Sequence, residues 1–223
     1  MNKQAGVTLI SLLIGLVIAM LCIIAVLTIY RTVVKTGTES RIYSNHDAQL
    51  QNSLTTAQML LQNAGYGLEG STHFKVDANI TAQVNGSNKS INPAILWRYR
   101  KNDSEVICQG LADISDTTNT KRQFVLLQGT SNGTVCDDTL DLASNSLTWK
   151  VQSSLANLQD FSADHSNPVQ ITWKKSSAKC TPYGAGKIDE SSQHLVITLS
   201  SKTSTQQMAN LRPVEVSVCL LNF

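Results

Sequence analysis

The side chains best suited to chemistry are few, and none of them stands in a recognised catalytic pattern. The histidines are His46, His73, His165 and His194, and nucleophilic catalysis would need one of them as a base beside a serine or cysteine. No G-x-S-x-G elbow, P-loop or G-x-G-x-x-G stretch accompanies them. We therefore predict no catalytic residue, no cofactor and no enzymatic activity, and we assign His46 and His194 structural or solvated roles.

Two charged clusters could bind a ligand. The run Asp137-Asp138-Thr139-Leu140-Asp141 offers oxygen ligands for calcium, but it lacks the spacing and the glycine of an EF-hand loop. A basic and aromatic cluster is formed by Trp173, Lys174, Lys175, Lys179 and Tyr183. Three positive charges are few for nucleic acid. We predict a solvated turn and a solvated edge, with no metal site and no specific nucleic-acid partner.

Four of the five cysteines form an even set in the polar part of the chain. Cys108, Cys136, Cys180 and Cys219 contain no C-x-x-C pair, which disfavours zinc. Two disulfides formed in an oxidising compartment are the better interpretation, and four cysteines allow three pairings. Cys22 lies in an apolar run and is predicted to be a small buried or lipid-facing residue.

Composition indicates an exported protein with one domain of ordinary size. The 223 residues carry a net charge of +2, so no basic footprint for nucleic acid is evident. Only 15% of the residues are charged, whereas serine, threonine, asparagine and glutamine are abundant.

The elements that must position these residues begin with one apolar stretch. Residues 7–30 contain no charged residue, histidine or proline, and as a helix they would span about 36 Å. A bilayer's hydrocarbon core is about 30 Å thick, so this stretch predicts a membrane-spanning helix. A secretory signal peptide would have a shorter apolar region followed by a cleavage site with small residues.

The residues at the start of this stretch resemble the prepilin-type (class III) signal of type IV pilins and type II secretion pseudopilins. The carrying sequence is Lys3-Gln4-Ala5-Gly6-Val7-Thr8-Leu9-Ile10-Ser11-Leu12. The resemblance implies that a prepilin peptidase cuts the leader 1–6 between Gly6 and Val7 and that Val7 is N-methylated. It also implies an assembly helix that begins with Thr8, Leu9, Ile10, Ser11 and Leu12. An ordinary signal anchor with an incidental Gly6 is the alternative.

Ser11 departs from the family, which usually has glutamate at this position of the mature chain. A carboxylate among apolar neighbours is costly unless it is paired, and in the family it pairs with the N-terminal ammonium of a neighbouring subunit. Ser11 cannot neutralise that ammonium. The resemblance therefore implies a subunit at the fibre tip, where one neighbour is absent, unless Ser11 is simply tolerated and other contacts carry assembly.

The remaining pattern predicts an α+β fold that is pilin-like. A long helix should run from Val7 to Ala64, because an apolar stripe at Leu50, Leu54, Ala57 and Leu61 keeps helical spacing after the chain turns polar. Residues 31–67 are then an amphipathic half that ends at Gly65-Tyr66-Gly67. Residues 68–223 form a β-rich domain, in which residues 68–93 read as a long polar connection. Strands are predicted at 95–100, 106–108, 124–127, 134–136, 147–151, 169–173, 195–199 and 214–220, in an antiparallel sheet of roughly four to seven strands.

The domain is similar to the PilW type of minor pilin, on a diffuse set of matches. They are the end of the helix at Asn63-Ala64-Gly65-Tyr66-Gly67, the run Cys108-Gln109-Gly110, the strand 124–127 with a hairpin ending in Cys136, and the closing strand. The resemblance implies that Cys108 pairs with Cys136 and Cys180 with Cys219.

The resemblance implies a structural protein of the inner membrane with a periplasmic C-terminal domain, which later joins a pilus fibre at the cell surface. Its implied role is to prime assembly of a type IV pilus and to remain at or near the tip. The implied partners are prepilin peptidase, other minor pilins, the major pilin, the inner-membrane assembly platform and a tip adhesin. Two alternatives are a J-like minor pseudopilin of a type II secretion system and a membrane-anchored binding module that never polymerises.

Overall fold

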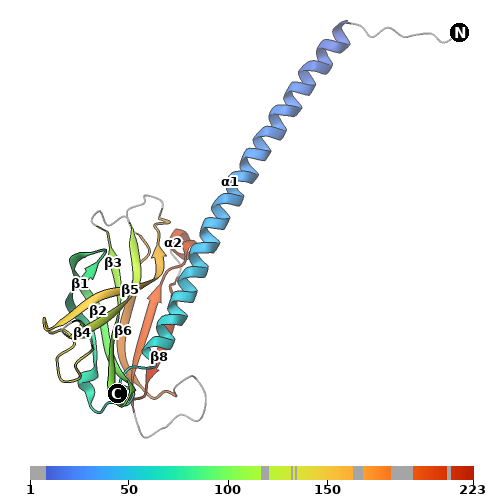
Figure 1. Ribbon diagram of the computed structural model, residues 1–223. Helices are drawn as coiled ribbons and strands as arrows, with labels where there is room; N and C mark the ends of the chain where they lie inside the picture. Colours follow the sequence, from blue (N-terminus) through green and yellow to red (C-terminus); the bar gives the residue numbers. More distant parts are fainter. Residues whose placement is uncertain are drawn as a thin grey trace. The chain divides into compact units, whose positions relative to one another are not determined.

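The computed structural model describes residues 9–116, 121–131, 133, 135–162, 168–181, 193–209 and 212–223. The chain divides into two compact units, residues 1–44 and residues 45–223. Helix α1 (Leu9–Leu61) belongs to both, and we call residues 9–44 its exposed half and residues 45–61 its docked half (Figure 1). The predicted long helix is thus confirmed, although α1 ends at Leu61 and turns follow as far as Gly67.

Five strands of the domain close into a small barrel in the order β1-β2-β3-β4-β5. Neighbouring strands are antiparallel, and closure is made by a short parallel contact in which Ala82 and Gln83 of β1 pair with Trp149 and Lys150 of β5. The strands are β1 (Phe74–Val84), β2 (Ser87–Asn102), β3 (Glu105–Ser115), β4 (Arg122–Ser131) and β5 (Leu147–Leu158).

The expected polar connection over residues 68–93 is wrong, because this segment forms β1 and the start of β2. In β1 the buried residues Ala78, Ile80 and Ala82 point to one face, and polar residues alternate with them. Two of these three buried side chains are small. The two strands meet at Asn85-Gly86, both with positive φ, which is the geometry of a two-residue hairpin turn. The short apolar side chains give a weak strand signal in the sequence, whereas the Asn85-Gly86 pair indicates the hairpin turn.

The central barrel strands are buried on both faces. One core cluster draws on all five strands and includes Ala94, Leu96, Val125, Leu127 and Trp149. Side chains alternate along a strand, so residues between these lie on the opposite face, and they are buried too. That second set includes Ile95, Trp97, Leu111, Phe124 and Leu126. The double burial explains why β2 and β4 read as continuous apolar runs rather than alternating ones.

A second, three-stranded antiparallel sheet has the order β6-β7-β8. Its strands are β6 (Ile171–Ala178), β7 (His194–Ser201) and β8 (Val214–Leu220), with the 3-10 turn η1 (Ser71–His73) and the short helix α2 (Ser204–Ala209) outside the sheets. Asp113 of the barrel accepts a hydrogen bond from the Ile171 backbone N–H (2.9 Å), and Asp77 accepts one from the Trp173 indole (2.9 Å). These two contacts join barrel and sheet.

The α+β class is confirmed, but the single sheet is replaced by a barrel and a separate sheet. Strand β8 matches its predicted bounds, whereas β3 and β5 run well beyond theirs. The hairpin expected between residues 127 and 134 is reduced to one bridge from Ser131 to Val135 after a longer β4. The predicted residue Thr134 lies outside the described residues.

Candidate functional site: the exposed half of the long helix

From Leu9 to Val34, large apolar side chains cover every side of the exposed half of α1. Leu9 is 80% exposed, Ile18 56% and Ile29 64%, and no residue of the most apolar window is buried. The apolar residues from Leu9 to Val34 include those at successive positions, so they form no single stripe that another part of the domain could cover. This is the surface of a helix made for an apolar environment.

The exposed area is far larger than a water-soluble monomer keeps. Monomers rarely leave contiguous apolar patches of more than a few hundred Å² in contact with water. The helix is long and apolar enough to cross a membrane, and its length and composition also fit a signal sequence. This half therefore has the surface of a single-pass membrane anchor or a signal sequence, and the described part of the domain does not cover it.

Only some of the residues predicted to take part in processing and assembly belong to the described chain. Gly6, Val7 and Thr8 lie outside the described residues, whereas α1 begins at Leu9. Leu9, Ile10 and Leu12 are 80%, 69% and 66% exposed, and Ser11 is on the same exposed turn. Cys22 is an exposed free thiol on this half, in agreement with a lipid-facing rather than a buried position.

Threonine hydroxyls in the exposed half form hydrogen bonds within the helix. The hydroxyls of Thr28, Thr32 and Thr38 donate to backbone carbonyls three or four residues earlier, at 2.7, 3.0 and 2.9 Å. Such bonds remove the cost of placing a hydroxyl in an apolar medium. Threonines are therefore compatible with burial of this half among lipids or other helices.

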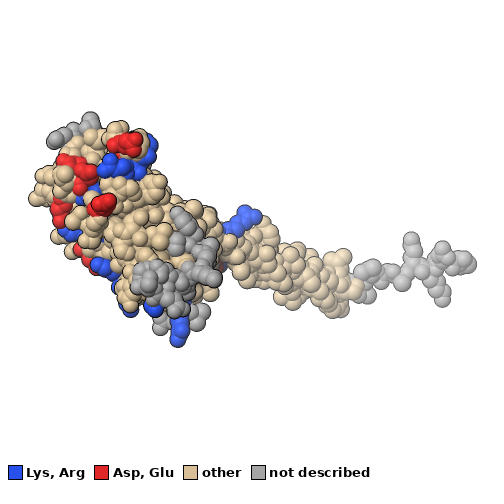
Figure 2. All heavy atoms as spheres, turned by 90° about the horizontal axis from the view of Figure 1, so that it is seen from below, with Lys and Arg blue, Asp and Glu red and all other residues tan. Residues whose placement is uncertain are grey.

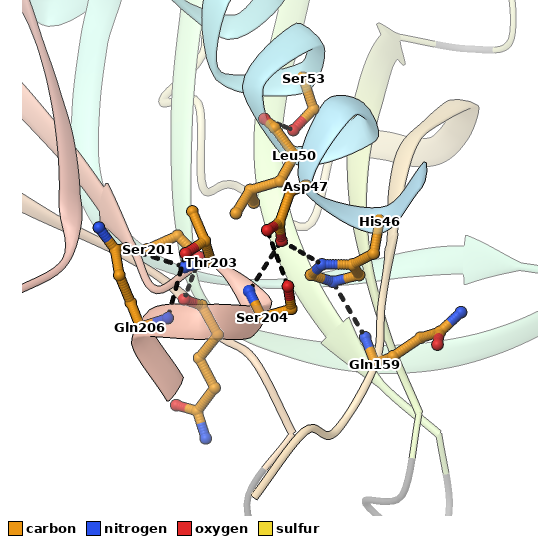
Figure 3. Close-up of polar contacts among 10 residues, drawn as sticks. His46, Asp47, Leu50, Ser53, Gln159, Ser201, Thr203, Ser204 and Gln206 are labelled. Atoms are coloured by element: carbon orange, nitrogen blue, oxygen red, sulfur yellow. Dashed lines mark hydrogen bonds and ion pairs between the residues drawn. The ribbon is translucent and has the colours of Figure 1, made fainter. Parts of the chain in front are cut away.

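The docked half is fixed in the domain by a partly buried polar network around Asp47 (Figure 3). Its carboxylate accepts hydrogen bonds from the Ser204 backbone N–H and hydroxyl, both at 2.7 Å. The imidazole of His46, 2% exposed, lies 3.1 Å from the same carboxylate through Nδ1. Its Nε2 faces the backbone N–H of Gln159 at 3.4 Å, so Nε2 is the acceptor and Nδ1 carries the proton that is donated to Asp47.

This grouping of serine, histidine and aspartate is structural. In a catalytic triad the serine hydroxyl bonds the imidazole, whereas here the Ser204 hydroxyl bonds the carboxylate and the residue is fully buried. The network joins α1 to the first turn of α2 and to Gln159, the residue after β5. The structural role predicted for His46 agrees with this geometry.

The start of α2 was missed by sequence reasoning although its signal was readable. Thr203 Oγ1 accepts from the Gln206 N–H (3.2 Å), while the Gln206 side chain accepts from the Thr203 N–H (3.0 Å). This reciprocal pair is a capping box, and T-x-x-Q is its sequence form. The Asp47 carboxylate adds negative charge at the same helix end, where exposed N–H groups favour it.

The far end of the docked half is held by the C-terminal residues. Asn222 donates to the Ala64 carbonyl (2.8 Å), and Gln58 donates to the Ser217 carbonyl of β8 (3.3 Å). A Cβ on Gly65, whose φ is +74°, would lie 2.6 Å from the Phe223 ring. Both the backbone angle and the close ring require glycine where α1 gives way to turns.

The candidate calcium ligands of residues 137–141 have partners within the protein, and Thr139 bonds the Asp137 carboxylate (2.8 and 2.6 Å). Arg98 is 1% exposed and donates to the Asp137 carbonyl (2.7 Å) and to the Leu140 carbonyl. Asp141 accepts from Lys75 at 2.9 Å, and Asp138 lies 3.6 Å from Arg100. The bond from Lys75 is the main cause that lowers the pKa of Asp141. The Arg98 guanidinium thus binds two backbone carbonyls of this loop. In the view of Figure 2, most of the Lys, Arg, Asp and Glu spheres lie on the domain, and the outer part of the described helix shows none.

The burial of Arg98 cannot be read from its place in the strand. Burial lowers the pKa of its guanidinium, and the nearby aspartates 138, 137 and 141 oppose that shift. The partners that make burial possible are backbone carbonyls some forty residues later in the chain. Strand periodicity carries no information about such distant acceptors.

The basic and aromatic cluster is only partly described. Lys174 and Lys175 are exposed on β6, and Trp173 is fixed by its bond to Asp77. Tyr183 lies outside the described residues. Lys174 and Lys175 alternate along the strand and so face opposite sides, which does not gather their charge into one patch.

Two disulfides tie the domain together. Cys108 of β3 is bonded to Cys136, and Cys180 is bonded to Cys219 of β8. These are the two pairs that the resemblance implies. The first links the barrel to the loop that holds Arg98, and the second fixes the segment after β6 to β8.

Comparison with known proteins returns no relative: no protein-family model matches the chain, and no curated protein or solved structure is significantly similar to it. The architecture itself is consistent with a pilin-like fold. A 53-residue helix with an apolar first half packs its second half against antiparallel sheets, in a domain that carries two disulfides.

Proposed function

We propose that this protein is a minor pilin, a structural subunit that primes assembly of a type IV pilus and sits at or near its tip. The observation that carries the proposal is the division of α1. From Leu9 to Val34 it has apolar side chains on all sides that the described part of the chain leaves exposed, while the same helix continues into a folded domain. Such a helix can reside in a membrane and later pack against equivalent helices in a fibre.

The proposal includes a site of processing and a set of partners. Prepilin peptidase would cut after Gly6 and leave Val7 as the methylated N-terminus. The chain would wait in the inner membrane with its domain in the periplasm, where an oxidising environment suits the two disulfides. Other minor pilins, the major pilin, the assembly platform and a tip adhesin would be its neighbours. The protein itself would catalyse no reaction.

The intact mass of the membrane-extracted protein tests processing. Expressed with its prepilin peptidase, the chain should lose residues 1–6 and gain one methyl group on Val7. Gly6→Val should keep the leader. Gly15→Ala is the matched control, because a Cβ at Gly15 meets nothing within 4 Å and the variant should be processed normally. A wild-type chain that keeps its leader beside active peptidase would refute the proposal.

Ser11 makes the tip position testable. Without a carboxylate at this position, a subunit cannot neutralise a neighbour's N-terminal ammonium in the middle of a fibre. Immunogold labelling should therefore find the wild-type domain at fibre ends, and Ser11→Glu should spread the label along the fibre. Label along the whole fibre in the wild type would contradict the tip position while leaving the pilin assignment in place.

Deletion of the gene distinguishes a minor pilin from the alternative proteins. A minor pilin predicts loss of surface pili, with loss of twitching motility and adhesion, whereas a J-like minor pseudopilin predicts failure of protein secretion with pili intact. A non-polymerising anchored module predicts neither defect and predicts that Leu12→Arg acts only through membrane insertion.

A further inference from the structure

We infer that Arg31 and Lys35 form a binding collar for anionic phospholipid headgroups in the membrane leaflet on the domain side. The inference rests on the membrane-spanning part of the proposed function. It concerns only the exposed half of α1 and does not depend on polymerisation. The observations that carry it are the length of the apolar run, the exposure of the two cations and the lack of strong internal partners.

The length of the apolar run places the collar at headgroup depth. From Leu9 to Ile29 the helix spans about 32 Å, which matches a hydrocarbon core of about 30 Å. Tyr30 follows at once and is 64% exposed, in the position where amphipathic aromatic rings mark a membrane interface. Arg31 then lies about 3 Å beyond Ile29, inside a headgroup layer about 5–7 Å thick.

Lys35 lies one turn later on the same helical face as Arg31. Its backbone is about 9 Å beyond Ile29, and helical side chains lean toward the N-terminus, which here is toward the membrane. A long lysine side chain can therefore bring its ammonium back to the phosphate layer. Arg31 and Lys35 together present two cations to one patch of headgroups.

Neither cation is strongly engaged within the protein. The Lys35 ammonium is 3.8 Å from Glu39, and the Lys35 side chain is 79% exposed. The Arg31 side chain is exposed and has no hydrogen bond or ion pair to the described part of the chain. The nearby hydroxyls of Thr28 and Thr32 are bonded to the helix backbone, so Arg31 and Lys35 are the exposed cations at this depth of the helix.

Charge complementarity selects the anionic phospholipids. A basic side chain near an anionic membrane surface gains a preference of about fivefold, which falls off within a Debye length of about 8–10 Å. Zwitterionic headgroups offer no net charge and hence no comparable preference. Arg41 lies about 18 Å beyond Ile29, outside that range, although it is also exposed and on the same helix.

Native mass spectrometry of the full-length protein tests the collar. The protein is reconstituted in nanodiscs that contain equal amounts of phosphatidylglycerol and phosphatidylethanolamine, and the lipids retained on it are counted. The wild type should retain phosphatidylglycerol in excess, on the order of tenfold. Arg31→Gln with Lys35→Gln should retain the two lipids about equally. Arg31→Lys with Lys35→Arg should keep the wild-type preference.

Arg41→Gln is the matched control, since it removes one positive charge from the same exposed helix. It should retain the wild-type preference. Equal retention of both lipids by the wild type, or a loss in Arg41→Gln as large as in the double variant, would overturn the inference. The processing test separates this failure from failure of the proposed function: a processed, fibre-forming protein without lipid preference would remove the collar alone.

Discussion

The two halves of α1 have the same secondary structure and opposite relations to the rest of the chain. In the exposed half, Leu13 and its apolar neighbours remain more than half exposed. In the docked half, Leu50, Leu54, Ala57 and Leu61 are at most 1% exposed and face the domain. One half therefore has its apolar cover within the protein, and the other requires cover from outside.

Polar groups differ between the two halves in one respect. Hydroxyls bond back to the helix backbone in both halves, as those of Thr32, Thr38 and Thr56 do. In the docked half, Asp47 and Gln58 reach α2 and β8. The docked half is thus tied to particular partners, whereas the exposed half from Leu9 to Val34 is marked by its apolar surface. Such a surface suits a helix that moves from lipid to a fibre.

The largest expected effect comes from shortening one leucine in each half. Leu54→Ala should lower the free energy of unfolding of the domain by about 2–5 kcal/mol, because it leaves a cavity under the docked half. Leu13→Ala removes the same atoms from an exposed position and should leave the domain unchanged. Chemical unfolding in detergent, followed by the near-ultraviolet circular dichroism of buried Trp97 and Trp149, measures both. Equal losses would remove the distinction between the halves.

This division was largely predictable, because it depends on composition and on helical spacing. The uncharged run after Val7 and the stripe from Leu50 to Leu61 are visible in the sequence, and both appear in α1. The final strand β8 was found from alternating β-branched residues. Residues 6–8, where the processing site was predicted, lie outside the described chain, so that part of the candidate site remains a prediction.

The parts that sequence reasoning missed depend on distant partners or on small residues. Strand β1 packs alanines at Ala78 and Ala82, which carry a weak β signal, so its Asn85-Gly86 turn was read as part of a loop. Arg98 is buried because carbonyls far along the chain accept its hydrogen bonds. The bond from Ser204 to Asp47 likewise joins residues 157 positions apart. Local patterns do not encode these contacts.

A smaller effect is expected from removing one acidic charge in each half. Asp47→Asn replaces one acceptor oxygen with a donor and removes the charge beside the start of α2. It should therefore lower the free energy of unfolding by about 1–2 kcal/mol. Glu39→Gln breaks only the exposed 3.8 Å pair with Lys35 and should change stability by less than about 0.5 kcal/mol. The same unfolding assay compares them, and a Glu39 effect as large as that of Asp47 would contradict the structural role of the network.

The smallest expected effect concerns the buried carboxylate of Asp113 in the domain. The described residues of the exposed half include no buried charge of this kind. Asp113 joins the barrel to β6, and desolvation raises the pKa of its carboxyl above the ordinary 3.8. The ion pair with Arg122 (3.0 Å) and the hydrogen bond from the Ile171 N–H oppose that shift, so the net effect is modest.

The sign of the pH dependence follows from this raised pKa. The folded protein binds the Asp113 proton more tightly than the unfolded chain, so ionisation above the folded-state pKa costs stability. As the pH falls from that pKa toward 3.8, the wild type should gain stability relative to Asp113→Asn, and below 3.8 their difference should become constant. Urea unfolding of both proteins across this range measures the difference. Parallel curves would show that the buried carboxylate is fully compensated by Arg122 and Ile171, and that the domain accommodates this charge at no greater cost than the unfolded chain does.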